Sequence, residues 1–162
     1  MKRKILIVED NVGLSQIQKD WLSRAGYDAV TAMSEPIARS LIRRMQFDLI
    51  LSDVRLPEGD GISLLEWLRK EKKDIPFIIT TEYVSVPDVV RTIKLGARDY
   101  LPKPVHRDYL LELAEDIFHP VATVRKQERQ LFHRTSPMIL KVEKFARLVA
   151  PSEMSVMILG AN

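Results

Sequence analysis

Five polar residues of this 162-residue chain each follow a short apolar segment, and their types suit chemistry on phosphorus. They are Glu9, Asp10, Asp53, Thr81 and Lys103. Three carboxylates that lie close together repel one another, so they need a cation to neutralise them. Because hard oxygen ligands without histidine or cysteine favour Mg²⁺, these residue types predict a magnesium site.

The same residues predict a phosphoryl transfer. With Mg²⁺ bound, Asp53 stays ionised and attacks phosphorus as a nucleophile, which forms an aspartyl phosphate. Mg²⁺ and Lys103 then stabilise the charge on the phosphoryl oxygens, and Thr81 offers a hydroxyl hydrogen bond. Each residue alone has a simpler interpretation, since an aspartate after a strand is usually a turn or helix-cap residue. Because such residues occur at the ends of four predicted strands, a shared phosphorylation site is favoured over separate turn or cap roles.

Short apolar segments that alternate with longer amphipathic ones must position these residues. The predicted strands are Ile5–Val8, Ala29–Thr31, Leu49–Leu51, Phe77–Ile79 and Tyr100–Leu101. The first, third and fourth are apolar at every position, which is typical of parallel strands covered on both faces. Five repeats of strand and helix predict an open parallel α/β sheet. Ligands of such sheets bind at the carboxyl ends of the strands, where the polar residues lie.

Apolar residues three and four positions apart predict helices between the strands. The predicted core-facing sets are Ile17, Trp21 and Leu22; Ile37, Leu41, Ile42 and Met45; Ile62, Leu65 and Leu68; and Val89, Val90 and Ile93. Ser34 and Ser85 each precede a first-turn proline and are predicted to cap helices through their hydroxyls, with Asp88 as a capping-box carboxylate. Gly26 and Gly96 are predicted to end helices.

Composition and charge limit the class of protein. Hydrophobic residues are 46% and charged residues 29% of the chain, as in ordinary globular proteins. The absence of cysteine excludes disulfides and is compatible with a reducing cytoplasm. No apolar run approaches the roughly 20 residues that span a bilayer, and no signal peptide is visible. We therefore expect a cytoplasmic protein without a membrane partner.

The net charge of +3 is spread along the chain. Residues 1–104 contain 17 Lys/Arg and 15 Asp/Glu, and residues 105–162 contain 8 and 7. No basic stripe with interleaved aromatic residues occurs, and such a stripe is typical of nucleic-acid interfaces. We expect no direct DNA binding by this chain.

A heptad-like series follows the fifth strand. Its positions are separated alternately by four and three residues, and the only polar one is Glu128. The apolar positions are Leu110, Ala114, Ile117, Val121, Val124 and Leu131. The series predicts a homodimer, joined by a coiled coil of the fifth helix and a linker helix over residues 120–135. The alternative is one amphipathic helix packed on the sheet, followed by a solvated linker. Pro120 weakens the first interpretation, because proline removes a helix hydrogen bond and kinks the rod.

Residues 1–119 resemble the receiver domains of two-component response regulators. The motifs that carry the resemblance are Ile5–Asn11, Ser52–Pro57, Asp60–Gly61, Thr81 and Gly96–Pro104. The resemblance implies a flavodoxin-like, doubly wound, five-stranded parallel sheet of strand order 2-1-3-4-5, with a C-terminal helical linker. It also implies a regulatory phosphoacceptor, not a turnover enzyme, that receives its phosphoryl group from a sensor histidine kinase.

The resemblance assigns roles to individual residues. It implies that Asp10, Asp53 and the backbone carbonyl of Arg55 coordinate Mg²⁺, and that Glu9 acts through a metal-bound water. The resemblance also implies that Lys103 pairs with the phosphoryl group. The peptide bond from Lys103 to Pro104 is expected to be cis.

The resemblance also implies a switch and shows departures from the family. The Thr81 hydroxyl is expected to move toward the phosphate while Tyr100 turns inward, with the fourth helix, fifth strand and fifth helix as output face. Glu82 replaces the small residue that usually follows the switch threonine, so it is expected to narrow access or repel a phosphodonor. Arg55 and Tyr83 flank the site, and this bulky pair predicts slow autodephosphorylation.

Residues 136–162 resemble the beginning of the central AAA+ ATPase domain of sigma-54-dependent activators. The similar positions are Ser136–Met138, Val142, Ala146, Val149–Ser152 and Val156–Gly160. A strand that leads into a glycine is how a phosphate-binding loop begins, but no catalytic motif of that domain is present here. The resemblance implies a truncated nitrogen-regulation-type activator. Its longer form would have sigma-54 RNA polymerase and DNA as partners.

Two other functions compete with this signalling switch. One is a receiver whose output is mainly protein–protein contact, against which the tail argues. The other is a Mg²⁺-dependent phosphohydrolase of small phosphate esters. Such enzymes generally carry a second aspartate two residues after the nucleophile, where this chain has Arg55.

Overall fold

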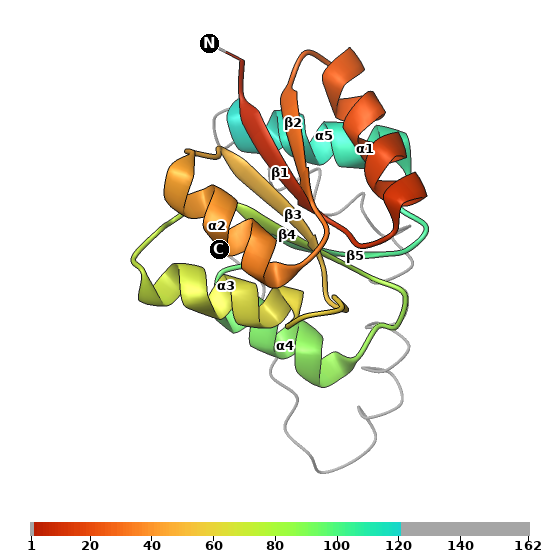
Figure 1. Ribbon diagram of the computed structural model, residues 1–162. Helices are drawn as coiled ribbons and strands as arrows, with labels where there is room; N and C mark the ends of the chain where they lie inside the picture. The colour runs from red at the N-terminus through yellow and green to blue at the C-terminus, as the bar shows by residue number, and fades with distance from the viewer. Residues whose placement is uncertain (1, 121–162) are drawn as a thin grey trace, which may run out of the picture. The chain divides into compact units, whose positions relative to one another are not determined.

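A computed structural model describes residues 2–120 of the chain. Strands and helices alternate throughout this part of the chain (Figure 1). The strands are β1 (Lys4–Val8), β2 (Asp28–Ala32), β3 (Leu49–Asp53), β4 (Phe77–Thr81) and β5 (Asp99–Pro102). The helices are α1 (Val12–Arg24), α2 (Glu35–Arg44), α3 (Gly61–Lys70), α4 (Val86–Lys94) and α5 (Arg107–Phe118). None of these helices is long and apolar enough to cross a membrane.

The five strands form one sheet in the order β2-β1-β3-β4-β5, and every neighbouring pair is parallel. The predicted flavodoxin-like, doubly wound sheet is therefore confirmed. In Figure 1, α1 and α5 cover one face of this sheet, and α2, α3 and α4 cover the other. The strand order reverses at β1 and β3, which places the carboxyl ends of these two strands at the switch point where ligands bind in such sheets.

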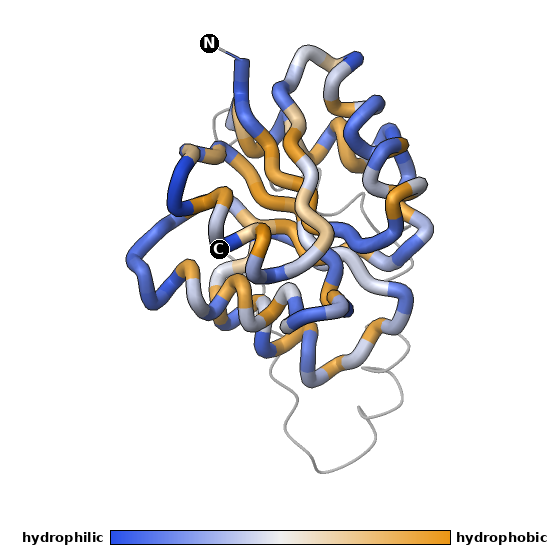
Figure 2. Tube along the Cα trace, viewed as in Figure 1, coloured by the Kyte–Doolittle hydropathy of each residue, from blue (hydrophilic) through white to orange (hydrophobic). Residues whose placement is uncertain are grey.

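The core lies in the central strands. Every residue of β3 and β4 is buried, as are the last four residues of β1. Figure 2 shows the hydrophobic residues gathered along the middle of the sheet between the two helical layers. The three predicted segments that are apolar at every position lie in β1, β3 and β4, which have neighbouring strands on both sides and helices on both faces.

Helix α5 packs against this core. Leu110 and Ala114 are fully buried in it, and Ile117 packs against the same cluster. These three side chains are therefore occupied within the domain, as in the alternative of a helix packed on the sheet. A dimer seam cannot include Leu110 and Ala114 while α5 covers the sheet. Val121, Val124, Leu131 and the rest of segments 121–135 and 136–162 lie outside the described residues.

The predicted helix faces are only partly correct. Six of the predicted core residues are buried: Leu22, Ile42, Ile62, Leu65, Leu68 and Val89. Four others are 44–49% exposed: Ile17, Ile37, Val90 and Ile93. Polar residues occupy part of the buried stripe instead, among them Thr92, whose hydroxyl donates to the carbonyls of Asp88 (2.8 Å) and Val89 (2.9 Å). Because that hydroxyl is satisfied within its own helix, Thr92 can be buried at little cost.

The helix ends follow a similar pattern. Gly26 and Gly96 end helices with φ of +95° and +79°, a region that glycine enters without strain. Ser34 and Ser85 occupy N-cap positions, but neither hydroxyl makes the predicted capping bond. A proline in the first turn already removes one free N–H at each of these helices, so less remains for a cap to satisfy.

Candidate phosphorylation and metal site

An acidic cluster forms at the carboxyl ends of the central strands. Asp53 is the last residue of β3, and Glu9 and Asp10 directly follow β1. Carboxylate oxygens of these three residues lie within 4.8 Å of one another. Glu9 and Asp53 are buried, whereas Asp10 is exposed at the edge of a hollow of about 250 Å³. The sequence prediction that these carboxylates converge is met by the geometry.

Lys103 supplies the positive charge of the cluster. Its Nζ lies 2.5 Å from Oδ2 of Asp53 and 2.6 Å from Oε2 of Glu9. The chain around Lys103 is held in place because its backbone N–H donates to the carbonyl of Thr81 at 2.7 Å. The peptide bond from Lys103 to Pro104 is cis, as the resemblance implied. One ammonium therefore bridges two buried carboxylates from different strands.

Burial and neighbouring charges shift the pKa values of Glu9 and Lys103 in opposite directions. Burial raises the pKa of Glu9, and its hydrogen bond to Lys103 offsets this only in part. Burial by itself lowers the pKa of Lys103, but the hydrogen bonds and charges of Asp53 and Glu9 outweigh it, so the Lys103 pKa is raised. Lys103 is thus a firmly protonated cation at neutral pH.

The donor set fits a hard divalent cation. All ligand atoms of the cluster are carboxylate oxygens, and Asp10 leaves one side open to solvent, as Mg²⁺ requires to keep its waters. One ammonium balances only one of the three negative charges, so an additional cation would relieve their repulsion. The backbone N–H of Arg55 donates to Oδ1 of Asp53 at 3.2 Å, which holds this loop against the acceptor carboxylate.

The two predicted switch residues are both buried. The Thr81 hydroxyl donates to the carbonyl of Tyr83 at 3.0 Å and accepts from its N–H at 3.2 Å. Tyr100 is 2% exposed. Its burial raises the pKa of the phenol, and the neighbouring Thr81 offsets this in part. In this conformation the Thr81 hydroxyl is thus bonded to its own loop while Tyr100 already lies inward.

The residues predicted to tune access lie at the mouth of the site. Arg55 and Glu82 line the hollow together with Asp53. The Arg55 guanidinium lies over the Tyr83 ring, 4.5 Å from its centroid, and this ring is largely exposed. A cation over an aromatic face is attracted to it, so the two side chains form a pair at the rim.

Sequence reasoning missed three features of the site. The Ser52 hydroxyl donates to the Asp53 carbonyl at 3.0 Å. A Cβ at Gly61 would overlap that same carbonyl oxygen, so α3 begins in direct contact with the acceptor's backbone. Glu35 contacts the loop after β3 from α2. The glycine stood in a recognised motif, but the contact of Glu35 spans 25 residues and has no local signal.

Comparisons with known proteins decide the family. Residues 5–115, well over half of the chain, match the family described as response regulator receiver domain. The chain belongs to this family. The solved receiver domain of HemR from Leptospira biflexa, not phosphorylated, has a TM-score of 0.69 and 34% identity and covers 75% of this chain and 98% of its own. A CheY-like receiver domain protein from Methanospirillum hungatei has a TM-score of 0.69 and 31% identity, covering 73% and 95%.

The curated relatives are longer regulators. The transcriptional regulatory protein GlrR of Escherichia coli is 34% identical over 159 residues, which are 98% of this receiver chain and 36% of GlrR. The response regulator protein PilR of Pseudomonas aeruginosa is 32% identical over 156 residues, or 93% of this chain and 35% of PilR. The chain thus spans about a third of the length of these relatives. Their similarity extends beyond the receiver into the residues after it.

Proposed function

We propose that this receiver is a Mg²⁺-dependent phosphorylation switch in which Asp53 accepts a phosphoryl group from a sensor histidine kinase. The observation that carries the proposal is the pairing of the Lys103 ammonium with both Asp53 and Glu9 inside a cluster of three carboxylates. Such a cluster is costly to bury and contributes little to the fold, so a chemical task is the simplest reason for it.

In the proposed reaction, a carboxylate oxygen of Asp53 attacks the donor's phosphorus atom. A new P–O bond forms while the bond to the donor's leaving atom breaks, and its electron pair stays with the donor. Lys103 stays beside the acceptor and neutralises phosphoryl oxygens. Bound Mg²⁺ would be held by Asp10, Asp53, the Arg55 carbonyl and, through water, Glu9, and it would supply the remaining charge neutralisation.

The output follows from the same site. The phosphoryl group would offer the Thr81 hydroxyl a stronger, charged acceptor than the Tyr83 carbonyl that it now contacts, and its movement would alter the packing of Tyr100. We propose that this change regulates a sigma-54-dependent activator with sigma-54 RNA polymerase and DNA as partners of the longer protein. A homodimer joined through residues 120–135 would carry the signal to it.

Access to Asp53 would be set by three rim residues. The paired Arg55 and Tyr83 side chains would shield the aspartyl phosphate from attacking water, which gives slow autodephosphorylation. Glu82 would repel small anionic donors because its carboxylate lines the same hollow. A phosphoprotein lifetime of only seconds after loading would contradict the shielding. Glu82→Ala should accelerate labelling by acetyl phosphate.

The decisive experiment treats the chain with acetyl phosphate, with and without Mg²⁺, and follows its mass. The wild type should gain one phosphoryl group only with Mg²⁺, and Asp53→Asn should gain none. Asp48→Asn, at the opposite end of the sheet, is the matched control and should gain it as the wild type does. Turnover of p-nitrophenyl phosphate would instead support a phosphohydrolase. A wild type that gains no mass under any condition would contradict the proposed function.

A further inference from the structure

A buried carboxylate outside the acidic cluster, that of Glu35, contacts the loop that follows Asp53. Glu35 is the first residue of α2 and is 5% exposed. Its Oε2 accepts a hydrogen bond from the backbone N–H of Asp60 at 3.0 Å. Its Oε1 accepts from the Arg39 guanidinium one turn further along α2. Both oxygens are therefore engaged, one with a distant loop and one with a counter-ion.

The loop is shaped around this side chain. The Glu35 backbone N–H donates to the carbonyl of Glu58 at 3.3 Å, so side chain and backbone both bind the segment 58–60. Gly59 has φ of +86°, and a Cβ there would overlap the Glu35 side chain. Because only a residue without a Cβ allows this approach, the loop and Glu35 fit each other closely.

From Asp60 the contacts continue to the phosphoacceptor. Asp60 caps α3 by accepting a hydrogen bond from the Ser63 N–H at 2.7 Å. Its backbone forms an isolated antiparallel β-bridge with that of Arg55 across the loop. Gly61 donates to the Val54 carbonyl at 2.9 Å, which closes the loop at its base. The Arg55 N–H in turn donates to the Asp53 carboxylate. Contacts therefore link Asp60 to the Arg55 backbone, both directly and through the neighbouring Val54.

We propose that Glu35 is a positioning residue for the phosphorylation site, which holds the 54–60 loop in the conformation that presents the Arg55 backbone to Mg²⁺ and to Asp53. The inference rests on the proposed function, because it assumes that Mg²⁺ binds beside Asp53. Glu35 is not among the carboxylates that would hold the metal. It acts as the outer partner that fixes a ligand-bearing segment, and loss of such partners weakens metal binding.

Arg39 serves as the matched comparison. Its guanidinium binds the Glu35 oxygen that does not contact the loop, and it lies over the Trp67 ring, 5.1 Å from the centroid. Removal of Arg39 leaves the bond from the Asp60 N–H to Glu35 in place. If Glu35 acts through the loop, Arg39→Gln changes the stability of the fold but not the affinity for Mg²⁺.

The test measures Mg²⁺ binding from ¹H–¹⁵N spectra. Glu35→Met keeps the volume but has no acceptor for the Asp60 N–H, whereas Glu35→Gln keeps one. We expect Glu35→Met to raise the Mg²⁺ dissociation constant about 10-fold. Glu35→Gln should raise the dissociation constant less than about 3-fold, and Arg39→Gln should leave it unchanged. Melting temperatures confirm that each variant is folded, and Glu35→Ala replaces the Met variant if that one is not.

The wild type supplies a readout that needs no variant. Its Asp60 amide signal should shift during the Mg²⁺ titration with the same midpoint as the signals of the metal site. An Asp60 signal that does not move overturns the inference, as does a folded Glu35→Met or Glu35→Ala with wild-type affinity. A wild type that binds no Mg²⁺ or is not phosphorylated instead refutes the proposed function, so the two failures are distinguishable.

Discussion

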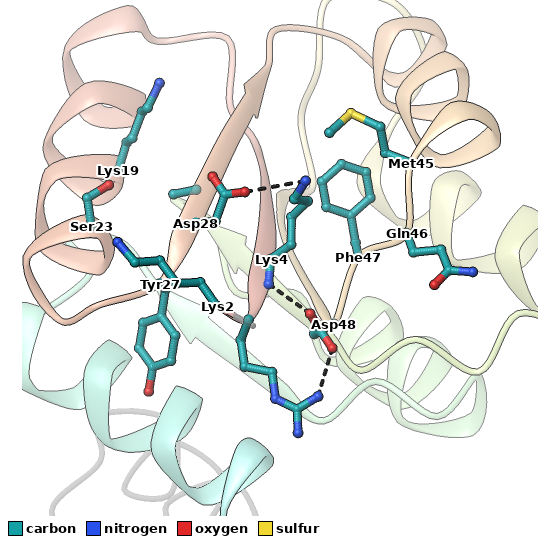
Figure 3. A pocket seen from close by; sticks show the side chains of 12 residues that line it. Lys2, Lys4, Lys19, Ser23, Tyr27, Asp28, Met45, Gln46, Phe47 and Asp48 are labelled. Carbon is teal, nitrogen blue, oxygen red and sulfur yellow. Dashed lines mark hydrogen bonds and ion pairs between the residues drawn. The ribbon is translucent and has the colours of Figure 1, made fainter.

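The two ends of this sheet use the same residue types in different ways. At the carboxyl ends of the strands three carboxylates lie close together, and the two buried ones, Glu9 and Asp53, share the ammonium of Lys103. At the amino ends, each acid has its own base: Arg3 pairs with Asp48 at 2.9 Å and Lys4 pairs with Asp28 at 3.3 Å, as Figure 3 shows for the labelled Lys4 and Asp28.

The hollow at the amino end is much the larger, about 970 Å³ against about 250 Å³. Each of its two acids pairs with a partly exposed base, so water screens these pairs and each contributes little, and Lys2 and Lys19 add further positive charge to the lining. In the smaller hollow, two buried carboxylates share one ammonium, and a third carboxylate lies exposed beside them. In this receiver, the proposed phosphorylation site therefore lies at the end with an imbalance of buried charge, not at the end with the larger cavity.

The largest difference between the two ends of the sheet is expected when the lysine at each end is replaced. Lys103→Met leaves the Asp53 and Glu9 carboxylates without their shared cation and the phosphoryl oxygens without a partner. We expect the rate of phosphorylation by acetyl phosphate to fall about 10²-fold. Lys4→Met removes only a surface pair and should leave that rate unchanged. Equal rates for the two variants at saturating Mg²⁺ would contradict a special role for Lys103.

A methyl group added at each end should sharpen the same contrast. Gly61→Ala places its Cβ against the Asp53 carbonyl oxygen, so α3 must shift, and we expect a loss of about 3 kcal/mol in the free energy of unfolding together with slower phosphorylation. Gly26→Ala has no atom within 4 Å of its Cβ and suffers only from φ of +95°, which costs about 1 kcal/mol. Urea titrations measure both losses. Slower phosphorylation of Gly26→Ala would show that global stability, rather than the local contact, limits the reaction.

Asp48→Ala tests whether the amino end serves only stability. Asp48 accepts from the Lys4 backbone N–H at 2.7 Å as well as from Arg3, so its loss leaves one backbone donor without a protein partner. We expect a decrease of about 1 kcal/mol in the free energy of unfolding. The phosphorylation rate should remain that of the wild type, and a rate that falls in parallel would mean that the two ends are coupled.

The sheet and the convergence of the acidic residues with Lys103 could be predicted from the sequence because both depend on local patterns. All-apolar strands identified the centre of the sheet, and Asp53 and Lys103 could be assigned because parallel strands bring their carboxyl ends together. The resemblance to receivers supplied the strand order. Apart from that order, these predictions required only the alternation of elements and the residues that follow each strand.

What depends on tertiary packing could not be predicted. Ile17 and Val90 fit an apolar helical face, yet the sheet selects a neighbouring stripe, and hydropathy does not record that selection. The heptad series from Leu110 satisfies a dimer seam and a monomer core equally well, because both bury the same spacing. The contact of Glu35 with Asp60 has no local signal in the sequence, since the fold brings these two residues together.

The smallest expected difference between the two ends concerns the stability of the protein at alkaline pH, to which Tyr27 at the amino end contributes. Burial, and then the hydrogen bond that the Tyr27 hydroxyl donates to Glu115 at 3.0 Å, raise the pKa of Tyr27 to about 12. The unfolded chain releases this proton near pH 10, whereas the folded chain keeps it, so the stabilisation is complete below about pH 10 and is lost as the pH rises toward 12.

Tyr27→Phe has no such proton and should lose less stability than the wild type between about pH 10 and 12. The difference should be under about 1 kcal/mol, because Tyr27 is partly exposed and solvent screens its interaction with Glu115. Urea midpoints at pH 9 and 11 for both proteins measure it, and the raised Lys103 pKa affects both alike. If the two proteins lose the same stability, the alkaline sensitivity arises from other groups with a raised pKa, such as Lys103 and Tyr100.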